Sequence, residues 1–253
     1  MELFFTYRDD MPDGHGFAHF SAKHLLFLAG IVLFIILFTL LYRNAGKRTR
    51  KRLRAIIASC IVLMEVAKQL LVTFTVGDHI YYHWELLPLH LCGISIIMVA
   101  IHTVKQNRFT GEYLYSLSIP GAAMALIFAD WTMYPLLNFY CLQSFLIHML
   151  ELTYPIMLLA AGELKPAVKN LWMPSLFLLV TVPLIYRLNH ILDTNFFFMN
   201  EAAPDSPLSF LQTYLGSPGY IFGAIGILAI LWFILYTPLV IYRKKKSRRR
   251  YRS

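Results

Sequence analysis

Seven continuous apolar runs, each about as long as a membrane-spanning helix, dominate the sequence. They cover residues 24–42, 55–76, 86–104, 113–129, 139–162, 171–188 and 220–242. A helix needs about 20 mostly apolar residues to cross the hydrocarbon core of a bilayer. Only 15% of the residues are charged, whereas a soluble domain usually has about 25%. The sequence therefore excludes a soluble domain and predicts an all-α, polytopic bundle of seven transmembrane helices.

Basic residues mark the ends of these runs in an alternating pattern. Lys and Arg are concentrated at residues 43–54, 105–108, 163–169 and 243–252, whereas loops 77–85 and 130–138 contain neither. Short loops rich in Lys and Arg stay on the cytoplasmic side of a membrane. Seven spans with the N-terminus outside and the C-terminus in the cytoplasm satisfy this pattern, and six or eight spans would break it. We therefore expect a multi-pass protein of the plasma membrane.

The chain has room for one domain and a short tail. Residues 1–242 are predicted to form the single seven-helix transmembrane domain, and residues 243–253 a disordered basic cytoplasmic tail. Clustered Lys and Arg beside a membrane attract anionic lipid head groups. The net charge of +9 does not indicate nucleic-acid binding, because the aromatic residues are not interleaved with the basic ones as they are in a nucleic-acid groove.

The cysteines are few and are not spaced for a metal. Cys60, Cys92 and Cys141 lie in or beside apolar runs, and there is no CxxC motif. Structural zinc sites use closely spaced pairs of Cys or His. We therefore expect neither a metal nor an organic cofactor, and a single Cys92–Cys141 disulfide stays open.

The second run contains three polar residues on one helix face. Ionisable residues inside a membrane span are costly and are kept mostly where they pair or act. Glu65, Lys68 and Gln69 lie three and four residues apart, which makes them neighbours on a helix. Two interpretations are open: a neutralising Glu65–Lys68 pair, or the polar wall of an internal cavity that receives substrate.

The third run opens with LPLHLC, which contains Pro88, His90 and Cys92. Proline suits the first position of a helix, because its missing N–H would be unpaired there anyway. A helix that begins at Pro88 places Cys92 in the second turn, near a helix end that stabilises anions such as a thiolate. His90 is two residues away, on another side of an α-helix, and is not expected to act as the base for Cys92. The competing interpretation of Cys92 is a small apolar residue without chemistry.

The fifth run carries Ser144, His148 and Glu151 on one stripe. Glu151 lies one turn beyond His148 and is predicted to hold the orientation and tautomer of the imidazole, as the third member of a catalytic triad does. At about 1.5 Å per residue, Cys92 and His148 lie at similar depths in the outer half of the bundle. A Cys92–His148 pair is therefore geometrically permitted.

Three segments carry a resemblance to a known family. LPLHLCGIS, the histidine of the fifth run and DTNFFFMNEAAPDSPLSFLQTYLGSPGYI occur in the same order as in the bacterial YwaF-type integral membrane proteins, which the chain resembles from Glu65 to Ile221. The same pattern extends to a eukaryotic transmembrane acyltransferase family of ether-phospholipid remodelling. The resemblance implies that Cys92 is the acyl-accepting nucleophile and His148 its general base. Asn195, near the start of the third segment, is expected to line the polar cavity.

Functions from different classes remain open. The first is a phospholipid acyltransferase or acyl hydrolase, in which Cys92 attacks an ester of a membrane phospholipid and the acyl chain passes to a lysophospholipid or to water. The second is a transporter or substrate-binding protein with a polar path through the bundle. That path would be lined by Glu65, Lys68, His90, His148 and Glu151. The third is a structural or regulatory partner of another membrane complex.

Overall fold

The computed structural model describes residues 3–75 and 84–250, and within these ranges the regular secondary structure is entirely helical. The predicted outer loop 77–85 lies mostly outside the described residues. The α-helices are α1 (Ala22–Asn44), α2 (Lys47–Thr75), α3 (Leu91–Val104), α4 (Arg108–Tyr113), α5 (Ile119–Ile127), α6 (Phe139–Ala160), α7 (Trp172–Leu192), α8 (Pro207–Leu215) and α9 (Gly219–Arg250).

Five of the described helices are long and apolar enough to cross a membrane, namely α1, α2, α6, α7 and α9. The other two apolar runs form shorter helices. The third run is helical over the 14 residues of α3, and the fourth is divided among α4, the π-helical segment η3 (Leu114–Ser118) and α5. The described chain is therefore all-helical with five candidate membrane spans, and each of the seven apolar runs contains helix.

Pro120 explains the irregular course of the fourth run. Proline has no N–H, so the carbonyl four residues earlier loses its helical partner. That carbonyl belongs to Ser116, and it accepts a hydrogen bond from Nε1 of Trp232 in α9 at 2.8 Å instead. The π-helical turn thereby becomes an attachment point for α9.

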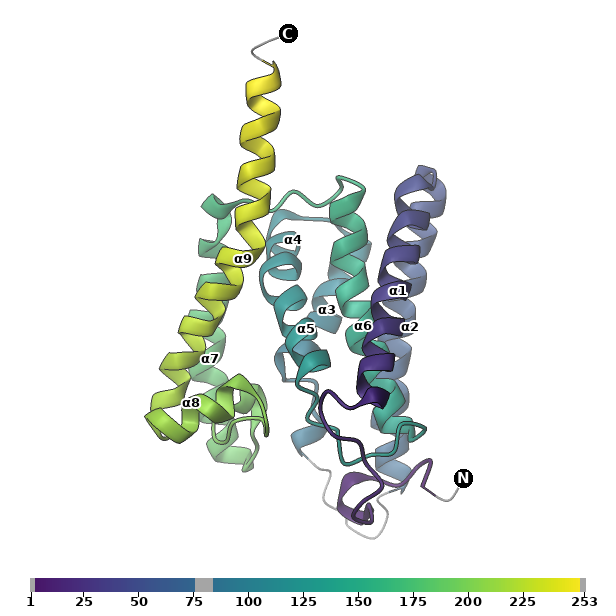
Figure 1. The fold of residues 1–253 in the computed structure, drawn as a ribbon, viewed down its shortest axis with the longest axis vertical. Coiled ribbons are helices and arrows are strands. Elements are labelled where there is room, and N and C mark those ends of the chain that lie inside the picture. The colour runs from purple at the N-terminus through teal and green to yellow at the C-terminus, as the bar shows by residue number, and fades with distance from the viewer. Residues whose placement is uncertain (1–2, 76–83, 251–253) are drawn as a thin grey trace.

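Two tyrosines strengthen the attachment between α9 and the α4–η3 segment. Tyr115 Oη donates to the carbonyl of Leu235 at 2.6 Å, and Tyr236 Oη donates to Glu112 at 3.1 Å. Figure 1 shows α4 beside α9, toward the end of the molecule from which α9 projects. The two tyrosine hydrogen bonds join α9 to the rest of the bundle. In a membrane, apolar side chains pack against lipid as favourably as against protein, so hydrogen bonds such as these contribute to helix association.

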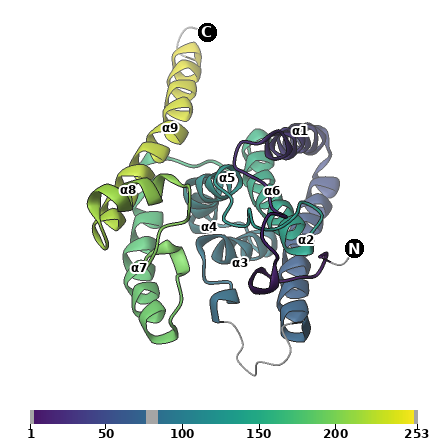
Figure 2. The ribbon, with the colours of Figure 1, turned by 60° about the horizontal axis from the view of Figure 1, so that its bottom comes forward.

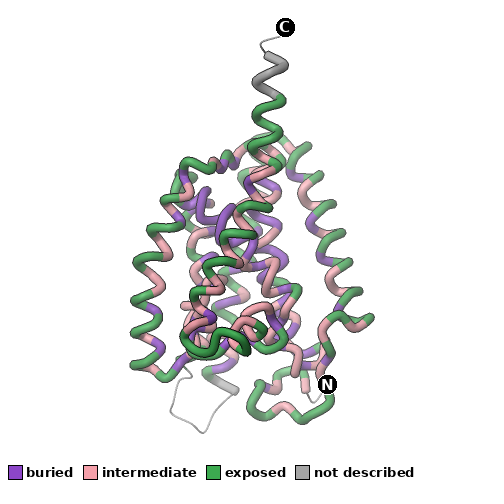
Figure 3. The backbone as a smooth tube through the Cα atoms, turned by 60° about the vertical axis from the view of Figure 1, so that its left-hand side comes forward, coloured by how far each residue is buried: buried purple, intermediate pink, exposed green. Residues whose placement is uncertain are grey.

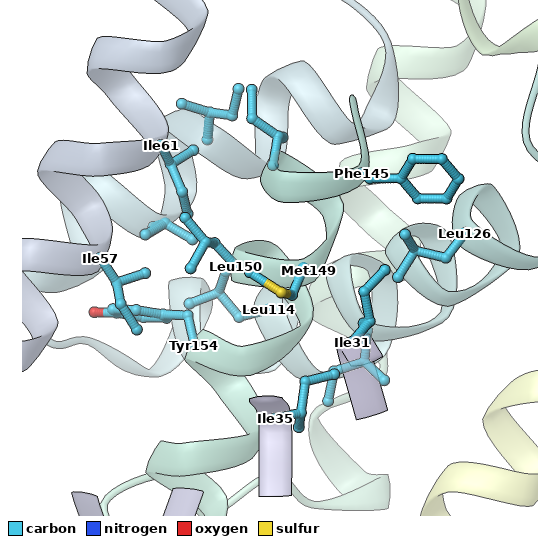
Figure 4. Close-up of a cluster of buried hydrophobic side chains, with 14 of the residues drawn as sticks. Ile31, Ile35, Ile57, Ile61, Leu114, Leu126, Phe145, Met149, Leu150 and Tyr154 are labelled. Carbon is cyan, nitrogen blue, oxygen red and sulfur yellow. The ribbon is translucent and has the colours of Figure 1, made fainter. Parts of the chain in front are cut away.

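The centre of the bundle is α6. It packs against α1, α2, α3 and α5, and Figure 2 shows it between the α1–α2 pair and the α3–α5 segment. Figure 4 shows side chains from three of these helices and from η3 around it: Ile35 of α1, Ile57 of α2, Leu126 of α5 and Leu114 of η3. The most apolar stretch of α6 is 61% buried, against 6% for α9. Most residues of α6 are therefore held by neighbouring helices, which makes it a rigid support for a site.

The outer helices expose large apolar side chains. Leu26 of α1, Leu179 of α7 and Phe233 of α9 are each more than 70% exposed, and Figure 3 shows exposed segments along the outside of the bundle and buried ones inside. A water-soluble protein rarely presents such continuous apolar surface. The exposed surface of α1, α7 and α9 is therefore suited to contact with lipid.

The N-terminal segment folds back over the loop between α5 and α6. Phe17 N donates to the carbonyl of Thr132 at 2.9 Å, and Asn138 Nδ2 donates to the carbonyls of Leu3 and Thr6 at 2.8 and 2.9 Å. Gly16 is required here, because a Cβ on it would lie 2.1 Å from the Thr132 carbonyl oxygen. This segment lies at the opposite end of the molecule from the C-terminal part of α9 (Figure 1).

The basic tail differs from the expectation of disorder. The helix α9 runs through the predicted boundary at residue 243 and continues to Arg250. Arg243 donates a hydrogen bond to the Pro166 carbonyl at 2.7 Å, which holds the first turn of the tail against the α6–α7 connection. Residues 243–250 are therefore helical, and residues 251–253 lie outside the described part of the chain.

Candidate functional site

A cavity of about 430 Å³ lies near the first turns of α3 and α6, at the same end of the molecule as the N-terminal segment. Helices α2, α3, α5, α6 and α7 contribute to its wall, together with residues between α7 and α8. Its polar lining residues are Glu65, Lys68, Glu85, His90, Cys92, Asp130, Gln143, Ser144, His148 and Ser206. Five residues that the sequence singled out as polar or reactive, besides Cys92, therefore share one cavity with it.

Cys92 lies closer to its helix end than expected. The helix α3 begins at Leu91, and His90 is its N-cap residue with extended backbone angles. The expected start at Pro88 is therefore wrong by three residues, and Cys92 lies in the first turn. The N–H groups of Leu91, Cys92 and Gly93 donate no hydrogen bond to any described residue, as is usual for the first turn of a helix.

Gly93 makes this tight entry to α3 possible. A Cβ on Gly93 would lie 2.4 Å from the carbonyl carbon and from the oxygen of Pro88. Only a residue without a side chain allows the backbone before α3 to approach its first turn so closely. The dipeptide Cys92–Gly93 is thus a unit in which the glycine sets the position of the cysteine.

His90 leaves the helix and joins the cavity wall. Its ring packs against those of Phe196 and Phe198, with centroids 5.4 and 5.1 Å away. The helical geometry used to separate His90 from Cys92 therefore does not apply, although both residues line the cavity. Phe198 and its neighbour Phe197 have positive φ angles of 53° and 61°, a strained backbone for aromatic residues.

His148 is held by the backbone of its own helix. Its Nδ1 lies 2.7 Å from the carbonyl oxygen of Ser144, and because a carbonyl only accepts, Nδ1 carries the hydrogen. In the neutral imidazole, Nε2 is then the acceptor. Trp131 stacks on the imidazole with ring centroids 5.1 Å apart and planes 20° apart. Tautomer and ring orientation are both set without a carboxylate.

Glu151 does not make the predicted contact with His148. Its side chain is fully buried, and neither carboxyl oxygen has a hydrogen-bond partner among the described residues. It is also absent from the residues that line the cavity. The prediction that Glu151 orients the imidazole is therefore wrong for this structure, since the Ser144 carbonyl takes that place. Glu151 does lie near enough to Cys92 for electrostatic interaction.

The polar face of α2 combines both interpretations of its sequence. Lys68 Nζ lies 2.9 Å from Glu65 Oε2, and both residues line the cavity. Gln69 Nε2 donates to Glu65 Oε1 at 2.8 Å and also to the carbonyl of Leu86. The pair is thus neutralising and also forms a polar wall, while Gln69 ties α2 to the segment before α3.

Asn195 does not line the cavity. Its Oδ1 accepts hydrogen bonds from the backbone N–H groups of Asn200 and Glu201 at 3.0 and 3.1 Å, and its Nδ2 donates to the Glu201 carbonyl at 2.8 Å. The amide therefore closes a turn of the loop between α7 and α8. It acts on the cavity only through the fold of this loop, which supplies Phe197 and Phe198 to the wall.

The cysteines are all free in the structure, with Cys60 exposed and Cys141 buried. The Cys92–Cys141 disulfide that the sequence left open is therefore not formed. Among the described residues, no group of three or more His, Cys, Asp or Glu side chains is arranged to hold a metal ion.

Comparison with known proteins assigns the chain to a family. The family model described as the TMEM164 family matches residues 19–236, which include every helix from α1 to α8 and much of α9. The chain belongs to the TMEM164 family. No curated protein and no solved structure matches it.

As a TMEM164 family protein with five candidate membrane spans, the chain is a multi-pass membrane protein. The matched residues contain the whole Cys92 cavity. The cavity is therefore a property of the family region rather than of the terminal extensions.

Sequence reasoning missed several residues at the cavity of this TMEM164 family member, among them Trp131 and Asp130. Both follow α5 and line the cavity, and Trp131 stacks on His148. Burial raises the pKa of Asp130 above its ordinary value, and the charge of Arg8 opposes this rise. An acidic residue next to a tryptophan, directly after an apolar run, was a usable signal, because indole rings favour the membrane interface.

Proposed function

We propose that this protein is a phospholipid acyltransferase or acyl hydrolase in which Cys92 is the nucleophile and His148 the general base. The observation that carries the proposal is that both side chains line one cavity, with the Nε2 of His148 left as a hydrogen-bond acceptor. The resemblance of the LPLHLC segment to YwaF-type proteins and to a transmembrane Cys–His acyltransferase family supports the same roles.

The remaining lining suits a lipid. Leu91, Met124, Ala125, Phe128 and Leu178 give the cavity an apolar wall beside its polar groups. Ligand cavities commonly combine an apolar lining with a few polar groups that fix orientation. An acyl chain would lie along the apolar wall, with its ester near Cys92.

The proposed reaction has two transfers. His148 Nε2 takes the Cys92 proton, the thiolate adds to the ester carbonyl, and the carbon–oxygen bond breaks to leave a thioester. The imidazolium returns its proton to the departing lysophospholipid oxygen. A hydroxyl of a second lysophospholipid, or water, then gives its proton to Nε2 and attacks the thioester, which restores the Cys92 thiol. No cofactor enters these steps.

The first turn of α3 would stabilise the oxyanion of each tetrahedral intermediate. The N–H groups of Leu91, Cys92 and Gly93 have no partner among the described residues, and they belong to the positive end of a helix. Donors aimed at a developing negative charge are commonly worth several kcal/mol in acyl transfer. Cys92 and these donors lie in one turn, as the mechanism requires.

The proposal includes the topology that the sequence predicts. Seven spans, an external N-terminus and a cytoplasmic C-terminus in the plasma membrane place the cavity in the outer half of the bilayer. In support, the N-terminal segment and the C-terminal part of α9 lie at opposite ends of the molecule (Figure 1).

A polar transport pathway is the second candidate function. The partly buried Glu65–Lys68 pair lines the cavity together with His90 and His148, which favours a polar pathway. Glu151, the innermost member of the expected path, does not line the cavity. The acyl-transfer proposal, unlike the transport pathway, gives a role to both Cys92 and His148.

The decisive experiment measures acyl transfer by the protein reconstituted in phosphatidylcholine nanodiscs. An isotopically labelled lysophospholipid is added, and its acylated product and the fatty acid released are quantified by mass spectrometry. Cys92→Ser and His148→Ala should each abolish both products, and the double variant should be no worse than either, because residues of one catalytic unit are strongly non-additive.

Cys141→Ser is the matched control. Cys141 also lies in a helix and is buried, but it does not line the cavity. The Cys141→Ser protein should therefore retain acyl-transfer activity. Full activity of a folded Cys92→Ser protein would overturn the proposal and favour the transport pathway.

A further inference from the structure

A second hollow lies at the opposite end of the bundle from Cys92. It is a groove of about 530 Å³ between the α3–α4 turn and the α6–α7 connection. The Cys92 cavity is near the first turns of α3 and α6, whereas this groove is at their last turns. The two share no lining residue, so the groove is independent of the proposed active site.

Three cations line this groove without an acidic partner. Arg108, Lys165 and Lys169 are exposed, and none forms an ion pair with a described residue. They come from two separate segments, the start of α4 and the connection between α6 and α7. An anion bound between these segments would be reached from both sides.

The two carboxylates of the groove are already occupied. Glu112 accepts hydrogen bonds from Ala167 N at 3.0 Å and from Asn170 Nδ2 at 2.6 Å, in addition to the Tyr236 hydroxyl. Glu163 is bound by the side chains of Tyr42, Arg50 and Arg54. Neither carboxylate is free to neutralise the three cations.

His102 provides a second, independent observation. It lines the groove and is only 3% exposed. Its Nδ1 lies 2.7 Å from Thr110 Oγ1, while its Nε2 has no partner among the described residues. The Thr110 hydroxyl donates its one hydrogen to the Asn107 carbonyl at 3.3 Å, so Nδ1 of His102 donates to Thr110 Oγ1 and Nε2 is an unused acceptor. Leaving a buried acceptor unsatisfied costs about 1–3 kcal/mol, which a hydroxyl of a ligand would recover.

We propose that this groove binds a phosphate group. A guanidinium and two ammonium groups match the several oxygens of a phosphate, and arginine binds phosphate in a two-pronged geometry that lysine complements as a point charge. The imidazole Nε2 would accept from a hydroxyl of the same ligand, either a protonated phosphate oxygen or a head-group hydroxyl. The phosphate belongs either to an anionic lipid head group or to a soluble phosphate compound. The groove lies at the last turns of α3 and α6, which is the level of head groups if these helices span the bilayer.

The test uses the full-length protein in neutral detergent with two probes. One is a short-chain phosphatidylglycerol, measured by native mass spectrometry, and the other is inorganic pyrophosphate, measured by calorimetry. The groove variant is Arg108→Gln/Lys165→Gln/Lys169→Gln. Whichever of the two probes the wild-type protein binds, the variant should bind it at least about tenfold more weakly, because each charge-assisted hydrogen bond is worth more than a tenfold change in affinity.

The matched control is Lys47→Gln/Arg48→Gln/Lys51→Gln. These three residues are exposed cations at the first turns of α2, on the same end of the bundle but outside the groove. The control removes the same charge and should bind like wild type. Loss with phosphatidylglycerol alone identifies a lipid head group as the ligand, and loss with pyrophosphate identifies a soluble one. Equal weakening by both variants, or no binding of either probe by wild type, would overturn the proposal.

His102→Ala tests the buried imidazole acceptor without a change in the exposed charge. It should weaken binding of the same probe by several-fold while the monodisperse elution of the protein is kept. Undiminished binding by the folded variant would remove His102 from the site and, with it, the second observation on which the groove was assigned.

Discussion

Gly93 lies directly beside the proposed nucleophile, and its missing side chain is what lets the chain turn there. In Gly93→Ala the new Cβ would lie 2.4 Å from the Pro88 carbonyl, so the backbone of residues 88–92 has to move. Overpacking of this kind costs about 1–3 kcal/mol, and the displaced thiol would no longer meet the ester. We expect loss of most acyl transfer in the nanodisc assay and a lower Tm.

Gly30→Ala is the control for this change. Gly30 is also in an apolar helix, but nothing lies within 4 Å of a Cβ placed on it. The activity and Tm of the Gly30→Ala protein should stay at wild-type values. A Gly93→Ala protein with unchanged activity would show that the entry to α3 does not position Cys92.

Glu151 is a residue where sequence and structure lead to opposite predictions. Its carboxyl oxygens have no hydrogen-bond partner to lose, so an amide of the same shape should be tolerated. Glu151→Gln should therefore keep both Tm and turnover close to wild type. A fall in turnover with normal folding would restore the orienting role that the helical spacing to His148 predicted.

At the residue scale, spacing predicted which side chains meet but not which atoms bond. Cys92, His148, Glu65 and Lys68 were expected near one polar site, and they line one cavity. The Ser144 carbonyl was not foreseen as the partner of His148, because every helix residue has a carbonyl and a sequence pattern reveals side chains only. Asn195 was misplaced because a loop amide can serve its own backbone as readily as a cavity.

At the scale of elements, Glu163 lies just after α6 and links the end of that helix to α1 and α2. Tyr42 Oη donates to it at 2.7 Å, and Arg50 and Arg54 bind its two oxygens. The α1–α2 turn is thereby fastened to the end of α6. Glu163→Gln removes the charge that both arginines need, and it should lower Tm by several degrees in detergent, whereas Glu201→Gln, on the loop between α7 and α8, should not.

The Glu163 contact also predicts how stability depends on pH. Burial alone would raise its pKa, but hydrogen bonds from Tyr42 and Arg50 and the charges of both arginines outweigh burial, so the pKa of Glu163 lies below its ordinary value. The unfolded chain then binds a proton more readily, and the stabilisation is lost as pH falls through the unfolded and then the folded pKa. Wild-type Tm should fall as pH is lowered below about 5 more steeply than that of Glu163→Gln. Parallel curves would contradict the contact.

Element boundaries were predictable only where the sequence carries a local cause. The run over residues 139–162 agrees with α6 because Asn138 caps its first turn through bonds to Tyr140 N and Cys141 N. The start of α3 was misjudged, since Pro88 is compatible with a first helical position but does not require one. The break in the fourth run follows from Pro120, yet the partner of the freed Ser116 carbonyl is Trp232, which lies over 100 residues later.

At the scale of the whole molecule, the proposed orientation can be read with engineered cysteines. In a Cys60→Ala/Cys92→Ala/Cys141→Ala background, cysteines at Asp13 and Asp205 should react with an impermeant thiol reagent added to intact cells. Both positions are exposed. A cysteine at Lys244, also exposed, should react only after the membrane is permeabilised. Labelling of Lys244→Cys in intact cells would reverse the orientation and place Cys92 in the inner half of the bilayer.

The helical class and the apolar surface were readable from hydropathy, because contact with lipid imposes a similar composition on every exposed face. The folding of the N-terminal segment over the α5–α6 loop could not be predicted from hydropathy. It depends on backbone contacts such as Phe17 to Thr132, which leave no periodic trace in either segment.

That same contact dictates a sequence of events while the chain is being made. His19 meets the Ala129 carbonyl across 110 residues of sequence. At a ribosomal rate of about 5–20 residues per second, the N-terminal segment waits roughly 5–20 s for its partner to emerge. During that interval α1 and α2 are already synthesised, while the α5–α6 loop that residues 3–21 contact does not yet exist. A chaperone or protease on the side of the membrane that the N-terminus faces would therefore meet residues 3–21 as an open peptide first, and as a folded segment only after the α5–α6 loop has been synthesised.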